Sequence, residues 1–377
     1  MKPLSSILAL VLFTVGCSIP GANEYSDDEF ESIPLKYATG FTIEKAEDFY
    51  VISIKTPFKG ATQPLTYVFY DKFDEKPDLR ADAYIPTPVE SIVCTSTTHI
   101  PLLDYLEETE ALTGFPTTDY ISSDKMRKRI DTGVVEELGI DEALNIERLI
   151  SIKPELVMGY SLSGDYGQFS LIEEAGIPVV LNAEYLEQHP LGRSEWIKVA
   201  GILFDKLDMA DSVFNSIERE YQSARNIAKT ATENPTVMSG IVYGDSWFVP
   251  GGNNYSARLL KDAGFKYLWG NDTSSAFLAL SFETVYDKAH NADYWIGISS
   301  FTNLDELAGS DNRYESFAPF VNNKVYSFNK RMGAAGGSEF LELGYLRPDI
   351  ILKDLVKIGH PDLLPDHELF FHFPLPN

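Results

Sequence analysis

Serine and histidine side chains are the first candidates for chemistry in this 377-residue chain. The run from Gly159 through Ser161 to Ser163 begins like the sharp turn that presents a nucleophilic serine, but Ser163 stands where that motif has its last glycine. A serine hydrolase would need His99 within hydrogen-bond reach of Ser161 or Ser163. We keep the hydrolase only as the weakest alternative, and we predict a protein without catalytic residues that is not an enzyme.

Metal-binding motifs are missing from the sequence. The six histidines include no pair four residues apart and no HExxH pattern, although His99 and His189 could meet in space. A zinc or manganese carrier would need three or four His or carboxylate ligands to converge, so we keep it as an alternative and predict no metal ligands. The chain also lacks the glycine-rich loops of P-loop and dinucleotide-binding proteins.

Aromatic and arginine side chains follow several of the short apolar runs that predict strands. Ligands of open α/β sheets bind beyond the carboxyl ends of the strands. Exposed Tyr, Trp and Arg side chains there stack on planar ligands and neutralise carboxylates or hydroxamates. We therefore predict these ligand-binding residues: His99, Tyr160, Tyr166, Tyr185, Arg193, Trp247, Tyr255 and Arg331.

The elements that must position these residues form two similar series. Short strands alternate with helices before residue 193 and again after residue 232, which indicates parallel sheets with crossover helices in each half. Examples are the expected strands 92–95, 155–159, 177–181, 236–243, 293–298 and 324–328. The fold class we predict is α/β, with two Rossmann-like lobes and a ligand cleft between them.

A long amphipathic segment separates the two series. Apolar residues recur at steps of three or four from Leu203 to Ala228, with charged residues between them, as on one face of a helix. Residues 207–231 alone would form a rod of roughly 37 Å. We interpret the segment as a rigid helix that bridges the lobes, with a long surface helix in one domain as the alternative.

These patterns give a domain plan. We predict a signal peptide at 1–17, a flexible tether at 18–34, an N-terminal lobe with a leading β-hairpin at 35–192, a bridging region at 193–232 and a C-terminal lobe at 233–377. The two halves echo each other, because a helix with a glutamate in its first turn, Glu147 or Glu283, leads into a strand ending in glycine. Helix-dipole stabilisation alone would explain either glutamate.

Charge and cysteine usage narrow the partners and the location. The net charge of −25 argues against nucleic acid as a partner and would suit docking onto a basic surface. The apolar run at 4–15 follows Lys2, is too short to span a bilayer, and ends just before Cys17, as in the lipobox of bacterial lipoproteins, except that Thr14 stands where leucine is preferred. A simple cleaved signal is the alternative. Once Cys17 is assigned to the signal sequence, Cys94 is the one cysteine left and cannot form an intramolecular disulfide. We expect it to be buried in a strand.

Longer segments resemble one family. Residues 145–157, 173–180, 190–198 and 347–355 and the run His360-Pro-Asp362 are similar to class III substrate-binding proteins of ABC transporters, in the version found in Bacteroidetes-type bacteria. This family captures cobalamin, ferric siderophores or haem. The resemblance covers roughly residues 89–371 and leaves the leading hairpin unmatched.

The resemblance implies a function without chemistry. It implies a monomer that holds a metal complex between two lobes and presents Glu147 and Glu283 to the permease subunits, whose ATPase partner supplies the energy. It places the protein on the periplasmic side of the cell envelope, anchored to a membrane by lipid at Cys17. No cofactor is expected. The ligand stays open between siderophore, haem and cobalamin; haem would want an axial ligand such as His99, Tyr160 or Met332.

Overall fold

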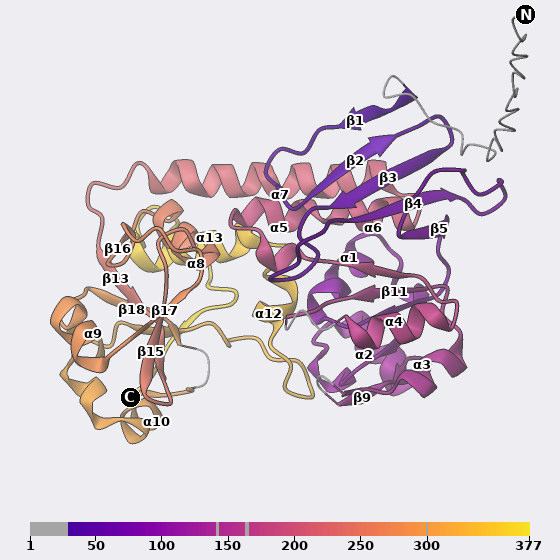
Figure 1. Ribbon diagram of the computed structural model, residues 1–377. Coiled ribbons are helices and arrows are strands. Elements are labelled where there is room, and N and C mark those ends of the chain that lie inside the picture. The colour runs from indigo at the N-terminus through magenta and orange to yellow at the C-terminus, as the bar shows by residue number, and fades with distance from the viewer. Residues whose placement is uncertain (1–28, 141–142, 163–165, 299–300) are drawn as a thin grey trace, which may run out of the picture.

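The computed structural model describes residues 29–140, 143–162, 166–298 and 301–377. Two α/β lobes lie side by side, and helices run along one side of both (Figure 1). The predicted signal peptide, Cys17, Ser163 and most of the predicted tether fall outside the described residues. The two-lobed α/β fold predicted from the sequence is confirmed.

The N-terminal lobe is built on a five-stranded parallel sheet in the order β12-β11-β6-β7-β8. Three of these strands, β6, β11 and β12, are buried along their whole length because helices cover both faces of the sheet. This burial explains why their sequences are uninterrupted apolar runs. Cys94 in β6 is fully buried, as predicted. The elements are β6 (Ile92–Cys94), α1 (Ile100–Tyr105), β7 (Leu112–Phe115), α2 (Asp124–Asp131), β8 (Glu136–Glu137), β9 (Gly139–Ile140), β10 (Ala143–Leu144), α3 (Ile146–Ile152), β11 (Leu156–Gly159), α4 (Gly167–Glu174) and β12 (Val179–Leu181).

The C-terminal lobe has a second five-stranded sheet in the order β16-β13-β18-β19-β20, parallel except for β20. A three-stranded antiparallel sheet, β14-β15-β17, stands beside it. The elements are β13 (Thr236–Ser239), β14 (Ile241–Tyr243), β15 (Ser246–Pro250), α8 (Tyr255–Asp262), β16 (Lys266–Tyr267), β17 (Phe277–Leu280), α9 (Phe282–Ala289), β18 (Tyr294–Ile298), α10 (Leu304–Ser310), α11 (Ala318–Val321), β19 (Val325–Ser327), α12 (Glu339–Leu343), α13 (Pro348–Gly359) and β20 (Phe373–Pro374).

The expected strand 236–243 is wrong as one element. Gly240 has a φ of +84° and separates β13 from β14, so the chain leaves the parallel sheet there. A Cβ at this position would lie 1.8 Å from the Phe248 carbonyl oxygen, so only glycine fits the close approach to β15. The antiparallel sheet that begins at this break was not predicted.

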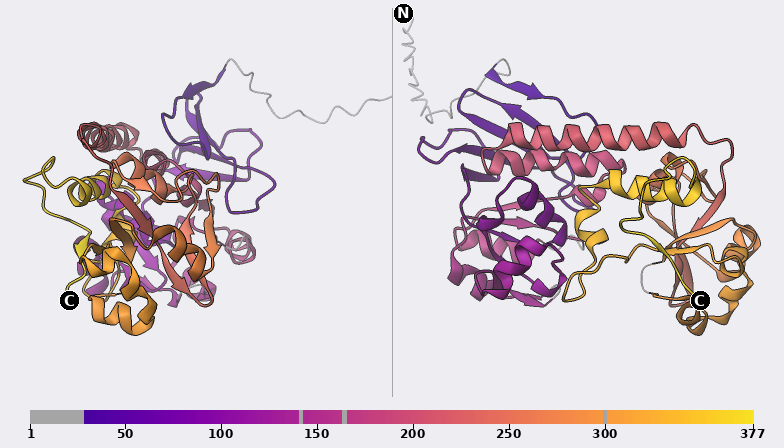
Figure 2. Two further views of the ribbon diagram at one scale, coloured as in Figure 1. Left: turned by 90° about the vertical axis from the view of Figure 1, so that its left-hand side faces the viewer. Right: turned by 180° about the vertical axis from the view of Figure 1, so that it is seen from behind.

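The bridging region is a set of three helices rather than one rod: α5 (Pro190–Glu195), α6 (Ile197–Leu203) and α7 (Leu207–Ala228). The apolar stripe from Ala210 to Ala228 is buried on α7, as expected, but Leu203 belongs to α6. The two helices pack closely where Gly201 faces Ala210, since a Cβ on Gly201 would lie 2.6 Å from the Ala210 Cβ. Helix α7 runs above both lobes, with α6 beneath one end and α13 beneath the other (Figure 2).

The N-terminal segment forms more than the predicted hairpin. Five strands pair in the order β1-β2-β3-β4-β5, antiparallel except that β4 and β5 are parallel. The strand β1 takes the last residues of the predicted tether. The strands are β1 (Glu31–Ile33), β2 (Phe41–Lys45), β3 (Phe49–Ile54), β4 (Leu65–Asp71) and β5 (Ala83–Thr87).

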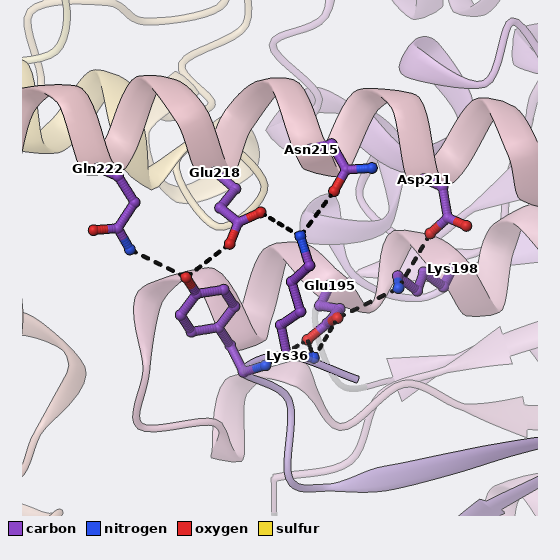
Figure 3. A network of polar contacts seen from close by, with 8 residues as sticks. Lys36, Glu195, Lys198, Asp211, Asn215, Glu218 and Gln222 are labelled. Atoms are coloured by element: carbon purple, nitrogen blue, oxygen red, sulfur yellow. Dashed lines mark hydrogen bonds and ion pairs between the residues drawn. The ribbon is translucent and has the colours of Figure 1, made fainter. Parts of the chain in front are cut away.

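The link between β1 and β2 is held by two buried carboxylates, Glu195 of the bridging region and Glu187 just before it. Glu195 on α5 accepts hydrogen bonds from the backbone N–H groups of Lys36 (2.8 Å), Tyr37 (2.8 Å) and Ala38 (2.9 Å). Its charge is balanced by Lys198, whose Nζ lies 3.4 Å away (Figure 3). Glu187 accepts in the same way from the backbone N–H groups of residues 39 and 40, at 2.9 and 2.7 Å.

Side chains of the link reach α7 as well. Lys36 Nζ lies 2.6 Å from a Glu218 carboxylate oxygen and 3.1 Å from Asn215 Oδ1 (Figure 3). The Tyr37 hydroxyl donates to Glu218 at 2.8 Å and accepts from Gln222 at 3.1 Å. The N-terminal sheet is thus seated on α5 and α7 through short, charge-assisted bonds.

Candidate ligand-binding cleft

A cavity opens at the carboxyl edge of the N-terminal sheet. The strand order changes direction between β6 and β11, and such switch points leave a crevice beyond the strand ends. A cavity of about 440 Å³ lies there, and we call it the N-lobe cavity. Its lining includes Thr95, Ser96, Thr97, Thr117, Tyr160, Ser161 and Gln168.

The C-terminal sheet has a matching cavity at its own switch point. The strand order changes direction between the parallel strands β13 and β18, and the ends of both strands, at Gly240 and Gly297, line a cavity of about 280 Å³. We call it the C-lobe cavity. Its lining is largely apolar and also includes Arg193, Pro250, Tyr255, Phe277, Phe340, Leu341, Tyr345 and His372.

Arg193 lies where the two cavities approach each other. Its guanidinium carbon lies 3.8 Å from the ring centroid of Tyr255 and 4.5 Å from that of Tyr345, and these two rings stack on each other at 5.9 Å. Nε and Nη2 donate to the backbone carbonyls of Glu187 (3.1 Å) and Tyr185 (3.0 Å). Within the described residues, Nη1 has no hydrogen-bond partner and stays available to a ligand.

Two further predicted tyrosines belong to the same cluster. The Tyr160 ring meets Tyr185 edge-on at 5.1 Å, and the Tyr185 hydroxyl donates to the Ser161 carbonyl at 2.6 Å. Partial burial raises the pKa of Tyr160, and the Tyr345 hydroxyl of the other lobe adds to the shift, whereas the Arg193 charge opposes it. Tyr160, Tyr185, Arg193 and Tyr255 are therefore brought together, with residues from both lobes facing one space.

A buried carboxyl group lies behind this cluster. Glu184 is 3% exposed and accepts a 2.6 Å hydrogen bond from the Thr98 hydroxyl, while its second oxygen has no partner among the described residues. Burial raises the pKa of Glu184 to about 7, and the Thr98 bond and the Arg193 charge oppose the rise. The carboxyl group is therefore partly protonated near neutral pH.

This shift predicts a pH-dependent stability. The pKa of Glu184 is about 4.3 in an unfolded chain and higher in the folded protein. Its contribution to the free energy of unfolding is therefore complete below about pH 4.3 and is lost as the pH rises through about 7. We expect the wild-type free energy of unfolding to fall by roughly 1–3 kcal/mol more than that of Glu184→Gln between pH 5 and pH 8. Urea titrations at both pH values measure this. An equal fall of the free energy of unfolding in wild type and Glu184→Gln would contradict this prediction. The control is Glu174→Gln, at an exposed position, which should behave as wild type does.

Two predicted residues are buried away from the cavities. Trp247 is fully buried among Trp295, Tyr314 and Phe317 and donates to the Ser239 carbonyl at 3.3 Å, so the expectation of an exposed stacking ring is wrong. His99 is also fully buried, and burial lowers its pKa to about 3, with the backbone of Met158 opposing the shift. Neither side chain offers a surface to a ligand in this structure.

Two other predicted residues lie apart from the cluster. The Tyr166 hydroxyl donates to Glu173 at 2.6 Å, and its ring packs on Phe169. Arg331 is exposed, pairs with Glu339 at 2.5 Å, and lies over the Phe370 ring. Neither one lines the N-lobe or the C-lobe cavity.

The described residues do not show the contacts that the two alternative functions would require. Neither ring nitrogen of His99 has a hydrogen-bond partner in the described part of the chain, so His99 does not activate Ser161. Within the same residues, no three His, Cys, Asp or Glu side chains converge as metal ligands would.

Glu147 and Glu283 occupy equivalent positions on the two lobes. Each is exposed in the first turn of its helix, α3 or α9, behind a capping residue, Asn145 or Ser281. Hydrogen bonds at the helix start lower the pKa of Glu283, and the nearby Arg313 charge adds to this. Helices α3 and α9 lie on different lobes, both away from α7 (Figure 1), so their N-terminal turns are free for a partner that spans the lobes.

Sequence reasoning missed several residues of the cleft. Tyr345 follows α12, and no pattern in the sequence placed it near Arg193. Glu184 was passed over because a single glutamate in a loop carries no signal. Phe277 lies in β17, which was not predicted, and its approach to the cavity follows from the break at Gly240.

Comparison with known proteins identifies the family. The model of a family described as periplasmic binding protein matches residues 92–331. The chain belongs to this family. Periplasmic binding proteins of this kind are non-enzymatic solute-binding components of ABC transporters, so the protein binds its ligand without transforming it. The family predicted from the sequence is confirmed.

Similar sequences occur in Methanocaldococcus jannaschii. An uncharacterised lipoprotein of Methanocaldococcus jannaschii is 26% identical over 301 residues, which cover 76% of this chain and 69% of the relative. This relative gives no support to the Bacteroidetes-type part of the resemblance. Within the described residues, no helix of this periplasmic binding protein is both long and apolar enough to cross a membrane.

Solved structures share the fold. A possible iron-binding periplasmic protein from Staphylococcus epidermidis superposes with a TM-score of 0.56 at 16% identity, covering 73% of this chain and 100% of that one. The periplasmic heme-binding protein RhuT from Roseiflexus sp. RS-1 gives 0.56 at 19% identity, covering 73% and 99%.

Proposed function

We propose that this periplasmic binding protein captures a metal complex, either an iron complex (siderophore or haem) or a corrinoid, and delivers it to an ABC permease. The observation that carries the proposal is the Arg193 guanidinium packed against the rings of Tyr255 and Tyr345, with Nη1 left available and Tyr160 facing it from the other lobe. Such a group suits a planar or chelated ligand with an anionic edge.

The architecture supports delivery to a permease. An exposed glutamate marks each lobe, Glu147 on α3 and Glu283 on α9, and the proposal assigns both to basic pockets of the permease. The bridging helices α6 and α7 are tightly packed at Gly201, which favours a small closure of the lobes rather than a wide hinge motion. Lipid attached to Cys17 would hold the protein at a membrane on the periplasmic side.

The first experiment uses the colour of the candidate ligands. The mature protein, from Cys17 onward with that residue changed to serine, is incubated separately with haem, cobalamin and several ferric siderophores, then desalted. We expect one chromophore to be retained at about one equivalent, visible in the absorption spectrum. Retention of none of them, together with zinc or manganese in elemental analysis, would contradict the proposal and favour the metal-ion carrier.

A further inference from the structure

The two cavities differ in chemistry. Among the described residues, the lining of the N-lobe cavity has five apolar members and no charged one, together with seven hydroxyl side chains and one amide: Thr95, Ser96, Thr97, Thr117, Tyr120, Tyr160, Ser161 and Gln168. The C-lobe cavity is lined mainly by aromatic and aliphatic side chains, with Arg193 as its cation. The N-lobe cavity therefore offers a ligand more uncharged hydrogen-bonding side chains, and the C-lobe cavity offers mainly hydrocarbon contacts.

The polar groups of the C-lobe cavity are mostly occupied within the protein. The Asn254 side chain accepts from the Ser256 N–H at 2.9 Å and donates to the Ser275 carbonyl at 2.9 Å. The Ser239 carbonyl accepts from the Trp247 ring. Because these groups are satisfied, a ligand in this cavity meets chiefly apolar surface apart from Arg193.

The apolar lining continues out of the cavity along the antiparallel sheet. Trp247 and Val249 of β15 point into the core and are fully buried, so Phe248 and Pro250 lie on the opposite face of the sheet, where Phe248 is exposed and Pro250 is buried. The register pairs Phe248 with Ala279 and Pro250 with Phe277, which places all four on one face. Pro250 and Phe277 also line the C-lobe cavity.

This face is exposed where it leaves the cavity. Phe248 is 38% exposed, Phe277 is 57% exposed, and Leu341 of α12, which also lines the cavity, is 48% exposed. We call these three residues the apolar strip. Exposed apolar surface of this kind marks a binding groove. Because Phe277 and Leu341 also line the C-lobe cavity, we infer that part of the same ligand covers the strip.

We propose that the ligand is an amphiphilic metal chelate, whose polar head occupies the N-lobe cavity and whose hydrocarbon arm lies along the apolar strip. The inference rests on the proposed function and narrows its ligand. Charge narrows it further, because a protein of net charge −25 with Arg193 as the cation of the C-lobe cavity favours a head that is neutral or carries one negative charge. Highly anionic chelates are disfavoured.

The test compares two ferric trihydroxamates that share one head, one with a twelve-carbon acyl chain and one without it. Binding is measured by equilibrium dialysis below the critical micelle concentration. We expect the acylated chelate to bind wild-type protein at least about tenfold more tightly, because several methylene groups leave water. In the variant Phe248→Ser this preference should fall to less than about threefold, with the affinity for the bare head unchanged, because Phe248 is not part of the lining of either cavity.

Controls separate the possible outcomes. Leu341→Asn, on a different element, should reduce the preference without touching the sheet, and Phe73→Ser, at a ring 86% exposed on the N-terminal sheet, should not change it. Equal binding of both chelates to wild type, or equal losses for both in the variants, would overturn the inference while leaving the proposed function intact. Retention of no metal complex of any kind would instead refute the proposed function. Variants that bind both chelates normally but lose uptake, or change oligomeric state, would assign the strip to a protein partner and overturn the inference.

Discussion

Uptake of the metal complex stops when Glu147 and Glu283 are both replaced by lysine, while ligand affinity in solution stays unchanged. This is the result we expect from the double variant in cells that depend on the transporter. The two side chains are exposed, lie on different lobes and are not part of either cavity, so reversing them changes only the surface that a permease would meet. Loss of two charge pairs at that interface should reduce uptake by roughly tenfold or more.

A matched variant controls for charge and for helix stability. Asp124 on α2 and Asp305 on α10 are also exposed, first-turn acids, one on each lobe. Their replacement by lysine makes the same change in net charge and the same unfavourable contact with a helix dipole, roughly 0.3–1 kcal/mol each. Uptake should survive in this control. Normal uptake in the Glu147→Lys/Glu283→Lys protein would show that the permease binds elsewhere.

Replacing Arg193 by alanine should weaken ligand binding by about 30- to 100-fold, or roughly 2–3 kcal/mol. The variant removes the cation that packs against the rings of Tyr255 and Tyr345, and it also removes the two hydrogen bonds to the backbone carbonyls of residues 185 and 187. Arg193→Lys keeps the positive charge but not the planar guanidinium, so its ligand affinity should lie between those of wild type and Arg193→Ala. Spectroscopic titration with the retained chromophore measures all three proteins.

Arg313 provides the matched control for this change. Its guanidinium carbon also lies over an aromatic ring, at 3.9 Å from the centroid of Phe282, but on the surface beside α9. Arg313→Ala should bind the ligand as wild type does. If Arg193→Ala bound equally well, the aromatic and arginine cluster would not be the ligand site, and the N-lobe cavity alone would have to account for binding.

The sequence predicted the repeating part of the fold because that part follows local rules. Buried parallel strands such as β11 are continuous apolar runs, and α7 has a helical period, so both are visible without tertiary information. The break at Gly240 was missed because it depends on the approach of Phe248, which belongs to another strand. The N-terminal sheet was underestimated for a similar reason, since the parallel pairing of β4 with β5 joins strands separated by a long loop.

The cleft was predicted in part, and the division has a physical cause. Tyr160 directly follows β11, so the topology alone carries it to the N-lobe cavity, whereas Arg193 lies further from its strand, within α5, and lines the C-lobe cavity from there. Trp247 also lies at a strand, but on the inward face of β15, and that alternation could be known only after β15 was recognised as a strand. Tyr345 reaches Arg193 from far along the chain, and no local pattern reports such a contact.

The seating of residues 36–40 on Glu187 and Glu195 has a mechanical consequence. Any pull on the N-terminal end of the chain passes through β1 and this link into α5 and α7, which belong to the axis that joins the lobes. The force therefore acts on the helices that connect the two lobes rather than on the outer edge of either lobe. A force applied at the helices that join the lobes exerts almost no torque on either lobe. Thermal motion of the N-terminal segment would therefore leave ligand binding between the lobes undisturbed.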